Sequence, residues 1–158
     1  MRTKRTIENL GSLNKRALAK FEPLLAEAEA AMTTQGVAIE VISGLRSWAA
    51  QAALYAQGRT KPGPIVTKAR PGSSWHNYGL AIDLGLFKGG KYLDSANPAL
   101  ADKLYSIIGA IAARHGIEWA GTWKTFQETP HFQVTFGLSL AAAKAKLESV
   151  GLDVQKLV

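Results

Sequence analysis

Two histidines and an aspartate, far apart in the sequence, have side chains that suit a divalent metal ion. His76 stands just before an apolar run, Asp83 lies within that run, and His131 opens a second one. Two imidazoles and one carboxylate are a ligand set that zinc accepts, with a fourth position left open for water. Glu128 precedes His131 by three residues, and a glutamate beside such a site can act as a general base. Together these residues have the chemistry of a zinc hydrolase.

Alternation along two predicted strands turns these side chains toward one face of a sheet. In GLAIDLGLF (79–87), Asp83 shares its face with two of the smallest residues of the run, and the bulky aliphatic residues take the other face. In PHFQVTF (130–136), His131 shares a face with Gln133. A buried carboxylate needs a partner, and a metal ion is one. The alternative is structural, because a single histidine beside a strand is more often only hydrogen-bonded.

The rest of the sequence predicts the elements that carry this face. Apolar spacing, capping residues and turn residues indicate helices and strands in alternation. We expect helices over 12–32, 47–58, 97–116 and 138–151, and strands over 37–43, 79–87, 117–119 and 130–136. Pro23 should kink or divide the first helix, 59–74 should form a long loop, and KGGK (88–91) should form a hairpin turn. The prediction is an α+β fold, with helices packed on a small, mostly antiparallel sheet and the zinc site on the sheet's open face.

Size and composition restrict the classes of function. The 158 residues suit a single domain over 1–158. There is no cysteine, and the charged N-terminus lacks the apolar core of a signal peptide. No apolar run is long enough for a membrane span, so we expect no stable membrane insertion. The net charge is +7, but the basic residues are scattered and match no nucleic-acid-binding motif, so we expect no nucleic-acid partner.

Two stretches resemble the motifs of a known family of zinc peptidases. SSWHNYGLAID (73–83) resembles the S-x-H-x-x-G-x-A-x-D motif of the D-Ala-D-Ala carboxypeptidase/dipeptidase family, which includes the vancomycin-resistance enzymes. ETPHF (128–132) resembles its second motif, in which an acidic residue precedes a histidine–aromatic pair, and SGLRS (43–47) resembles its S-G-x-R-S segment. The resemblance covers about residues 37–136. It implies a zinc peptidase domain with Zn²⁺ as cofactor.

The resemblance also assigns roles to individual residues. It implies that His76, Asp83 and His131 are the zinc ligands and that Glu128 is the catalytic base. Arg46, in SGLRS, would place a positive charge near the oxyanion or a substrate carboxylate; the alternative is an ordinary pair with a surface acid. Weaker candidates, for substrate contact or for support of the ligands, are Ser74, Trp119, Trp123 and Gln133. Each of these can instead serve turn formation or packing.

Within the family, the pattern WxxxWxxFxxxPHFQ (119–133) looks closest to the L-alanyl-D-glutamate endopeptidases of phage lysis. Many of those enzymes have an aspartate where this chain has Glu128, and the longer side chain changes the reach of the base. The resemblance implies hydrolysis of the L-Ala–D-Glu bond of peptidoglycan, synthesis in the host cytoplasm, export through a holin-type pore to the periplasmic wall, and a monomeric enzyme. The positive charge suits an anionic wall.

Two other functions stay open at this point. One is a D-Ala-D-Ala carboxypeptidase or dipeptidase that trims peptidoglycan precursors with the same metal. The other is a non-catalytic wall-binding module.

Overall fold

The computed structural model describes residues 1–158, and a five-stranded sheet lies at its centre. The strands follow the order β1-β2-β5-β4, with β3 paired to β2, and every pairing is antiparallel. Their bounds are β1 Ala38–Ser43, β2 Ala81–Lys88, β3 Lys91–Tyr92, β4 Glu118–Trp119 and β5 His131–Gln133. The predicted α+β class with an antiparallel sheet is confirmed.

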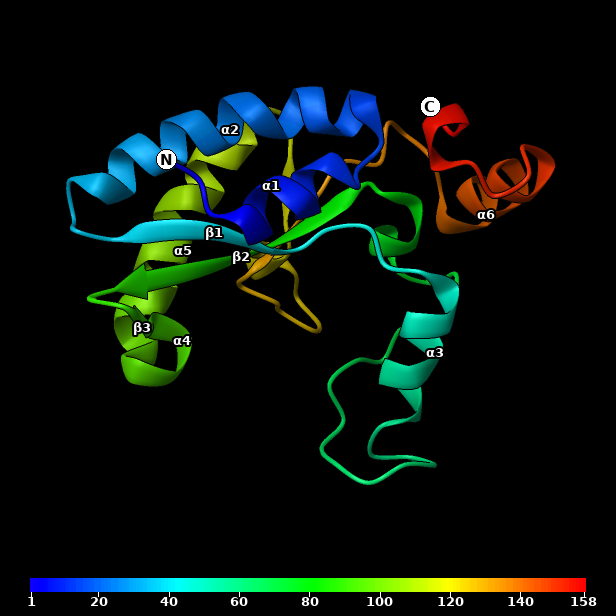
Figure 1. Ribbon diagram of the computed structural model, residues 1–158, viewed down its shortest axis with the longest axis horizontal. Coiled ribbons are helices and arrows are strands. Elements are labelled where there is room, and N and C mark those ends of the chain that lie inside the picture. Colours follow the sequence, from blue (N-terminus) through cyan, green and yellow to red (C-terminus); the bar gives the residue numbers. More distant parts are fainter.

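Helices cover one face of this sheet. Figure 1 shows α2 running along the sheet beside α1, with α5 passing behind β1 and β2. The helices are α1 Lys4–Gly11, α2 Lys15–Thr33, α3 Trp48–Ala56, α4 Leu93–Ala96, α5 Pro98–Arg114 and α6 Leu140–Ser149, and the short 3-10 turns are η1 Trp75–Tyr78, η2 Ala120–Thr122 and η3 Val154–Lys156. The core side of β2 is formed by Leu80, Ile82 and Leu84, all fully buried. No helix is both long enough and apolar enough to cross a membrane.

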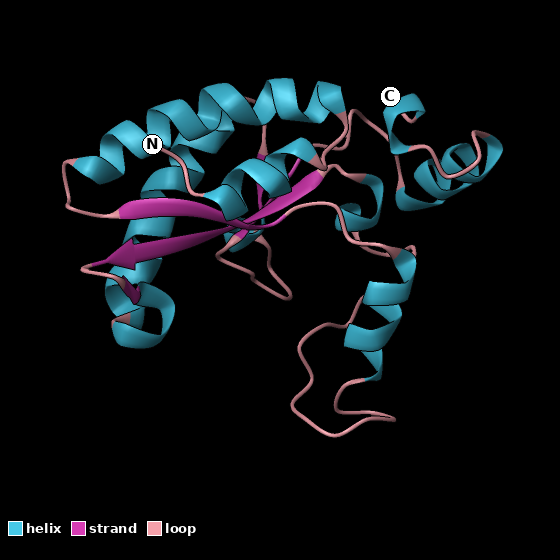
Figure 2. Cartoon of the chain, viewed as in Figure 1, coloured by secondary structure: helices cyan, strands magenta, loops and turns pink.

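The segment after β1 projects from this body. α3 and the residues that follow it extend away from the sheet (Figure 1), and most of the chain from 57 to 74 is loop (Figure 2). The predicted long loop over 59–74 is therefore confirmed. Ser47 caps α3, since its side chain accepts a hydrogen bond from the Ala50 N–H. This projecting segment stands next to the open face of the sheet, where it borders the site.

The first predicted helix is undivided and begins later than expected, and a further helix precedes it. α2 continues from Lys15 to Thr33 through Pro23, so the proline does not divide it. The proline removes one backbone donor, but buried residues on both sides of it, Phe21 and Leu24, pack the helix into the core. The helix also begins later than predicted, because Asn14 caps it with its side-chain oxygen. The charged residues before it form α1, which the apolar pattern did not indicate.

Trp119 fits between two glycines at the sheet edge. A Cβ atom added to Gly109 of α5, or to Gly121 of η2, would lie 2.1 Å from the Trp119 side chain. The indole N–H donates to the Thr129 carbonyl at 2.8 Å, and the ring stacks on Phe132. The indole therefore joins α5 to the loop that leads into β5.

Candidate metal centre and active site

The pairing of β2 with β5 brings two of the predicted ligands together. Asp83 lies directly opposite His131 in the antiparallel register, so both side chains are on the same face. That face is the one opposite Ile82 and Phe132, which are fully buried in the core. The predicted shared face is confirmed.

The third predicted ligand, His76, reaches this face from η1. Ser74 caps the turn, accepting a hydrogen bond from the His76 N–H at 3.3 Å. Gly79 then has a φ of +67°, and this left-handed conformation redirects the chain into β2. A Cβ atom at Gly79 would come within 2.9 Å of the Asn14 nitrogen, so the close approach also requires glycine. Ser74 thus acts on the turn that positions His76.

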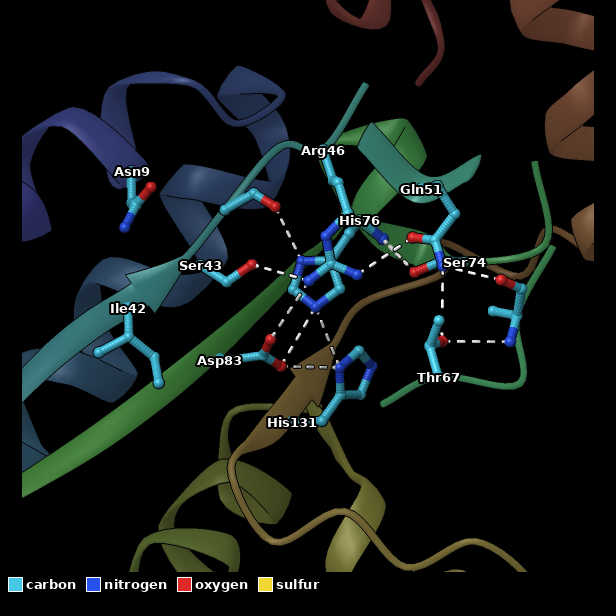
Figure 3. Close-up of polar contacts among 12 residues, drawn as sticks. Asn9, Ile42, Ser43, Arg46, Gln51, Thr67, Ser74, His76, Asp83 and His131 are labelled. Carbon is cyan, nitrogen blue, oxygen red and sulfur yellow. Dashed lines mark hydrogen bonds and ion pairs between the residues drawn. The ribbon is translucent and has the colours of Figure 1, made fainter. Parts of the chain in front are cut away.

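Three ligand atoms form a nearly equilateral triangle (Figure 3). His76 Nε2 lies 3.1 Å from Asp83 Oδ1 and 3.2 Å from His131 Nδ1, and His131 Nδ1 lies 3.1 Å from Asp83 Oδ1. In a tetrahedral zinc site with bonds of about 2.0–2.1 Å, neighbouring ligand atoms are about 3.3 Å apart. The triangle therefore has the size of one face of such a tetrahedron, and the residues fit a zinc ion.

The hydrogen bonds behind the two imidazoles fix which nitrogen faces the triangle. His76 Nδ1 lies 2.8 Å from the Gly44 carbonyl, and His131 Nε2 lies 2.9 Å from Gln133 Oε1. These oxygens can only accept, so both of these nitrogens carry the hydrogen. His76 Nε2 and His131 Nδ1 then carry lone pairs. These lone pairs and the Asp83 carboxylate point toward the centre of the triangle. Three converging acceptors require a positive charge between them.

The charges of the cluster agree with this requirement. Burial would raise the pKa of Asp83, but when a proton on an imidazole supplies this positive charge in place of an ion, hydrogen bonds from His131 and His76 and their charges hold the pKa of Asp83 well below its usual range. Burial would lower the pKa of His131, but the hydrogen bond to Asp83 and its charge raise it instead. The aspartate is therefore ionised, and the site attracts a cation.

Arg46 lies beside the same carboxylate. Its Nη2 is 3.7 Å from Asp83 Oδ2, and it donates through Nη2 to Ser43 Oγ and through Nη1 to Gln51 Oε1, each at 3.1 Å. Its acidic neighbour is thus a member of the metal cluster and not a surface acid. The side chain is mostly buried and held at several points, so its charge is fixed in place at the site.

Two supporting residues were missed in the sequence. Gln51 of α3 is fully buried and donates through Nε2 to the Ala69 carbonyl at 2.8 Å, so it connects Arg46 to the projecting loop. The sequence feature that could have indicated Gln51 is that it is a single polar residue within an otherwise apolar helix. Glu118 accepts from Gln133 Nε2 at 3.1 Å and from Trp123 Nε1 at 2.6 Å. This contact orients the Gln133 amide, so that its oxygen faces His131.

An open cleft of about 790 Å³ lies over the triangle. The projecting loop forms one lip and the loop before β5 forms the other; the lining includes residues 66–69, 73–75 and 126–130. Glu128 is among the lining residues, with its side chain exposed, and its backbone carbonyl accepts from the His131 N–H. Trp123 lines the cleft, with its ring centroid 5.7 Å from that of His131, whereas Trp119 packs outside it.

A small antiparallel sheet with two buried histidines and a partly buried aspartate at the base of an open cleft has the groups of a metal-dependent hydrolase domain. Residues 67–134 match the family model described as D-alanyl-D-alanine carboxypeptidase. The chain is also 42% identical over 112 residues to the peptidoglycan L-alanyl-D-glutamate endopeptidase CwlK of Bacillus subtilis, a match that covers 67% of this chain and 66% of that protein. The chain belongs to this D-alanyl-D-alanine carboxypeptidase family, which confirms the family predicted from the motifs.

Solved structures agree with this fold. The L-Ala D-Glu endopeptidase ChiX of Serratia marcescens superposes with a TM-score of 0.57 at 26% identity, covering 86% of this chain and 91% of that chain. The vancomycin resistance D,D-pentapeptidase VanY, solved in complex with Zn(II), superposes with a TM-score of 0.53 at 19% identity. The match covers 92% of this chain and 83% of that chain. The second likeness concerns the fold alone.

Proposed function

We propose that the protein is a zinc-dependent peptidoglycan endopeptidase that hydrolyses the L-Ala–D-Glu bond of stem peptides. The observation that carries this proposal is the triangle of His76 Nε2, Asp83 Oδ1 and His131 Nδ1 at the base of an open cleft. The choice of bond is supported by the names of the Bacillus and Serratia relatives. The choice of zinc is supported by the size of the triangle and by the ion in the VanY structure.

The chain's own residues have distinct roles in this proposal. His76, Asp83 and His131 would hold the ion, which would supply Lewis-acid chemistry for a water and for the scissile carbonyl. Glu128, exposed in the same cleft, takes the proton from the attacking water and returns it to the leaving amine. Arg46 adds a fixed positive charge that stabilises negative charge developing on the substrate.

The biological setting is a separate part of the proposal. Lysis of a host by a phage is supported by the likeness of the pattern over 119–133 to phage endopeptidases. In that setting the protein is made in the host cytoplasm, passes through a holin-type pore and acts on the periplasmic wall as a monomer. The Bacillus relative is named for cleavage of the same bond, although it is a bacterial protein. The bond that is cleaved and the phage setting are therefore separate questions, and each can be tested without the other.

The test is digestion of purified sacculi, followed by identification of new N-termini. The wild-type protein should release D-glutamyl N-termini, EDTA should abolish the release, and added zinc should restore it. Glu128→Gln should lower turnover by about 100-fold or more, the usual contribution of a general base, while zinc content stays unchanged. Absence of any EDTA-sensitive release of amino groups would contradict the proposal.

A carboxypeptidase that removes terminal D-alanine is the second candidate, favoured by the description of the family model. It predicts free D-alanine in the same digest, with no D-glutamyl N-termini. A non-catalytic wall-binding module predicts binding to sacculi without either product.

A further inference from the structure

The cleft contains one cation that has no acidic partner. Two basic side chains, Arg46 and Lys68, line it. Arg46 is engaged by Asp83, Gln51 and Ser43, as described above. Lys68 is exposed and forms no salt bridge; its Nζ instead lies 3.4 Å from the centre of the Phe126 ring. The ammonium group therefore remains able to bind a carboxylate.

The contact between Lys68 and Phe126 spans the cleft from lip to lip. Lys68 belongs to the projecting loop and Phe126 to the loop before β5, and both residues line the cleft. Phe126 has a φ of +56° and is 58% exposed, although it is neither glycine nor asparagine. A residue other than glycine keeps such a backbone where neighbouring groups determine it. The Phe126 ring holds the Lys68 ammonium over the cleft through a cation–π attraction.

The chemistry of the proposed substrate supplies a matching anion. A D-glutamate residue has two carboxyl groups, and only one of them continues the peptide chain. The other stays free, and it is only a few bonds from the nitrogen of the L-Ala–D-Glu bond. When that bond lies over the metal site, a free carboxylate must therefore lie in the same cleft.

We propose that Lys68 binds this free carboxylate and makes the enzyme select D-glutamate over its amide. Phe126 occupies one side of the ammonium and leaves its other hydrogens for the carboxylate oxygens, since an ammonium has three donors. Lys68 is then a specificity-determining residue that does not take part in bond breaking. This inference rests on the proposed function, because it requires D-glutamate next to the scissile bond.

The experiment compares two stem peptides that differ only in whether the free D-glutamate carboxyl is an acid or an amide. For the wild-type enzyme, kcat/KM should be about tenfold higher for the acid, as expected for one hydrogen bond between charged groups. Lys68→Gln should lower the acid rate to near the amide rate, so that the preference is lost, and Lys68→Arg should retain the preference. Lys61→Gln, an exposed lysine of the same loop outside the cleft lining, should retain it too.

The preference for acid over amide separates this role from a structural one. If Lys68→Gln lowers both rates equally, or leaves the preference intact, the inference is wrong and the proposed function stands. The same conclusion follows if the wild-type enzyme cleaves both peptides equally. If the wild-type enzyme cleaves neither peptide nor the sacculi, the proposed function fails and this inference fails with it.

Discussion

Each imidazole of the metal cluster is oriented by an oxygen atom behind it. The Gly44 carbonyl holds His76 Nδ1–H, and Gln133 Oε1 holds His131 Nε2–H. Both rings are nearly fully buried, so neither can turn to another partner. The lone pairs are therefore directed at the ion's position before it binds, and little ordering is needed when it arrives.

Replacing Gln133 with methionine should weaken zinc binding while the three ligands remain. The variant loses the oxygen that fixes the ring of His131, and loss of such a partner typically costs 10–100-fold in metal affinity. Competition with a chromophoric chelator measures this affinity. Gln127→Met is the matched control, because Gln127 lines the same cleft but is exposed and makes no hydrogen bond through its side chain. Equal affinity of Gln133→Met and the wild-type protein would contradict the prediction.

The His–Asp–His cluster and its neighbour Gln133 could be predicted from the sequence, but two further supporting residues, Glu118 and Gln51, could not. Alternation along a strand places Asp83 and His131 on a face without knowledge of any other element. Glu118 acquires its role only from the register of β4 against β5, in which it lies opposite Gln133. Gln51 acquires its role from the packing of α3 against the loop that follows. Contacts between elements are not encoded in local periodicity.

At the scale of elements, strong local signals predicted structure well and tertiary contacts determined the rest. The hairpin at Gly89 and Gly90, both with positive φ, was predicted from two glycines between strands. α1 was missed because few of its residues are buried. It is held instead by β1, where Asn9 Nδ2 donates to the Val41 carbonyl at 2.7 Å and the Thr6 hydroxyl accepts from the Val41 N–H at 3.1 Å.

The ion pairs of Glu27 in α2 with Arg114 and His115 at the end of α5 should weaken in acid. The hydrogen bonds from His115 and then from Arg114 hold the pKa of Glu27 below its usual value of 4.5. A carboxyl whose pKa is lower in the folded state stabilises the fold above its unfolded pKa, and this stabilisation is lost as the pH falls through the folded pKa. Wild-type protein should therefore have a slightly higher Tm than Glu27→Gln at pH 7, since exposed ion pairs contribute little.

Thermal melts from pH 7 to pH 3 test this prediction. The difference in Tm should shrink once the pH falls below about 4.5, the unfolded value of a glutamate. Glu148→Gln serves as control, because Glu148 is exposed and forms no ion pair. A difference that stays constant across this range would show that the loss comes from packing and not from the carboxylate charge.

At the scale of the whole molecule, the segment beside the cleft has a net positive charge because it contains no acidic residue. Residues 41–82 contain Arg46, Arg59, Lys61, Lys68 and Arg70 but no aspartate or glutamate. This stretch includes α3 and the projecting loop, which stand away from the rest of the chain (Figure 1). A cationic projection beside a cleft raises the rate of encounter with an anionic polymer, and dissolved salt screens this attraction.

Activity on sacculi should therefore fall as salt is added. We expect a decrease of about tenfold in kcat/KM between low salt and 0.5 M NaCl, within the range of electrostatic steering. Lys61→Glu should have a lower rate at low salt and a weaker dependence on salt. Initial rates on sacculi at several NaCl concentrations measure both effects. Identical salt dependence in the two proteins would argue against a role for this surface in substrate encounter.

The indole of Trp119, enclosed by Gly109 and Gly121, limits how this protein can be altered by evolution or by design. Replacing a helical glycine with alanine is a standard route to higher stability, but at Gly109 the added methyl group would collide with the ring. Displacing the ring would break its hydrogen bond to the Thr129 carbonyl and disturb the loop that carries Glu128. The substitution would therefore lower turnover. The three positions therefore constrain one another sterically, so a larger residue at either glycine requires a smaller side chain at position 119.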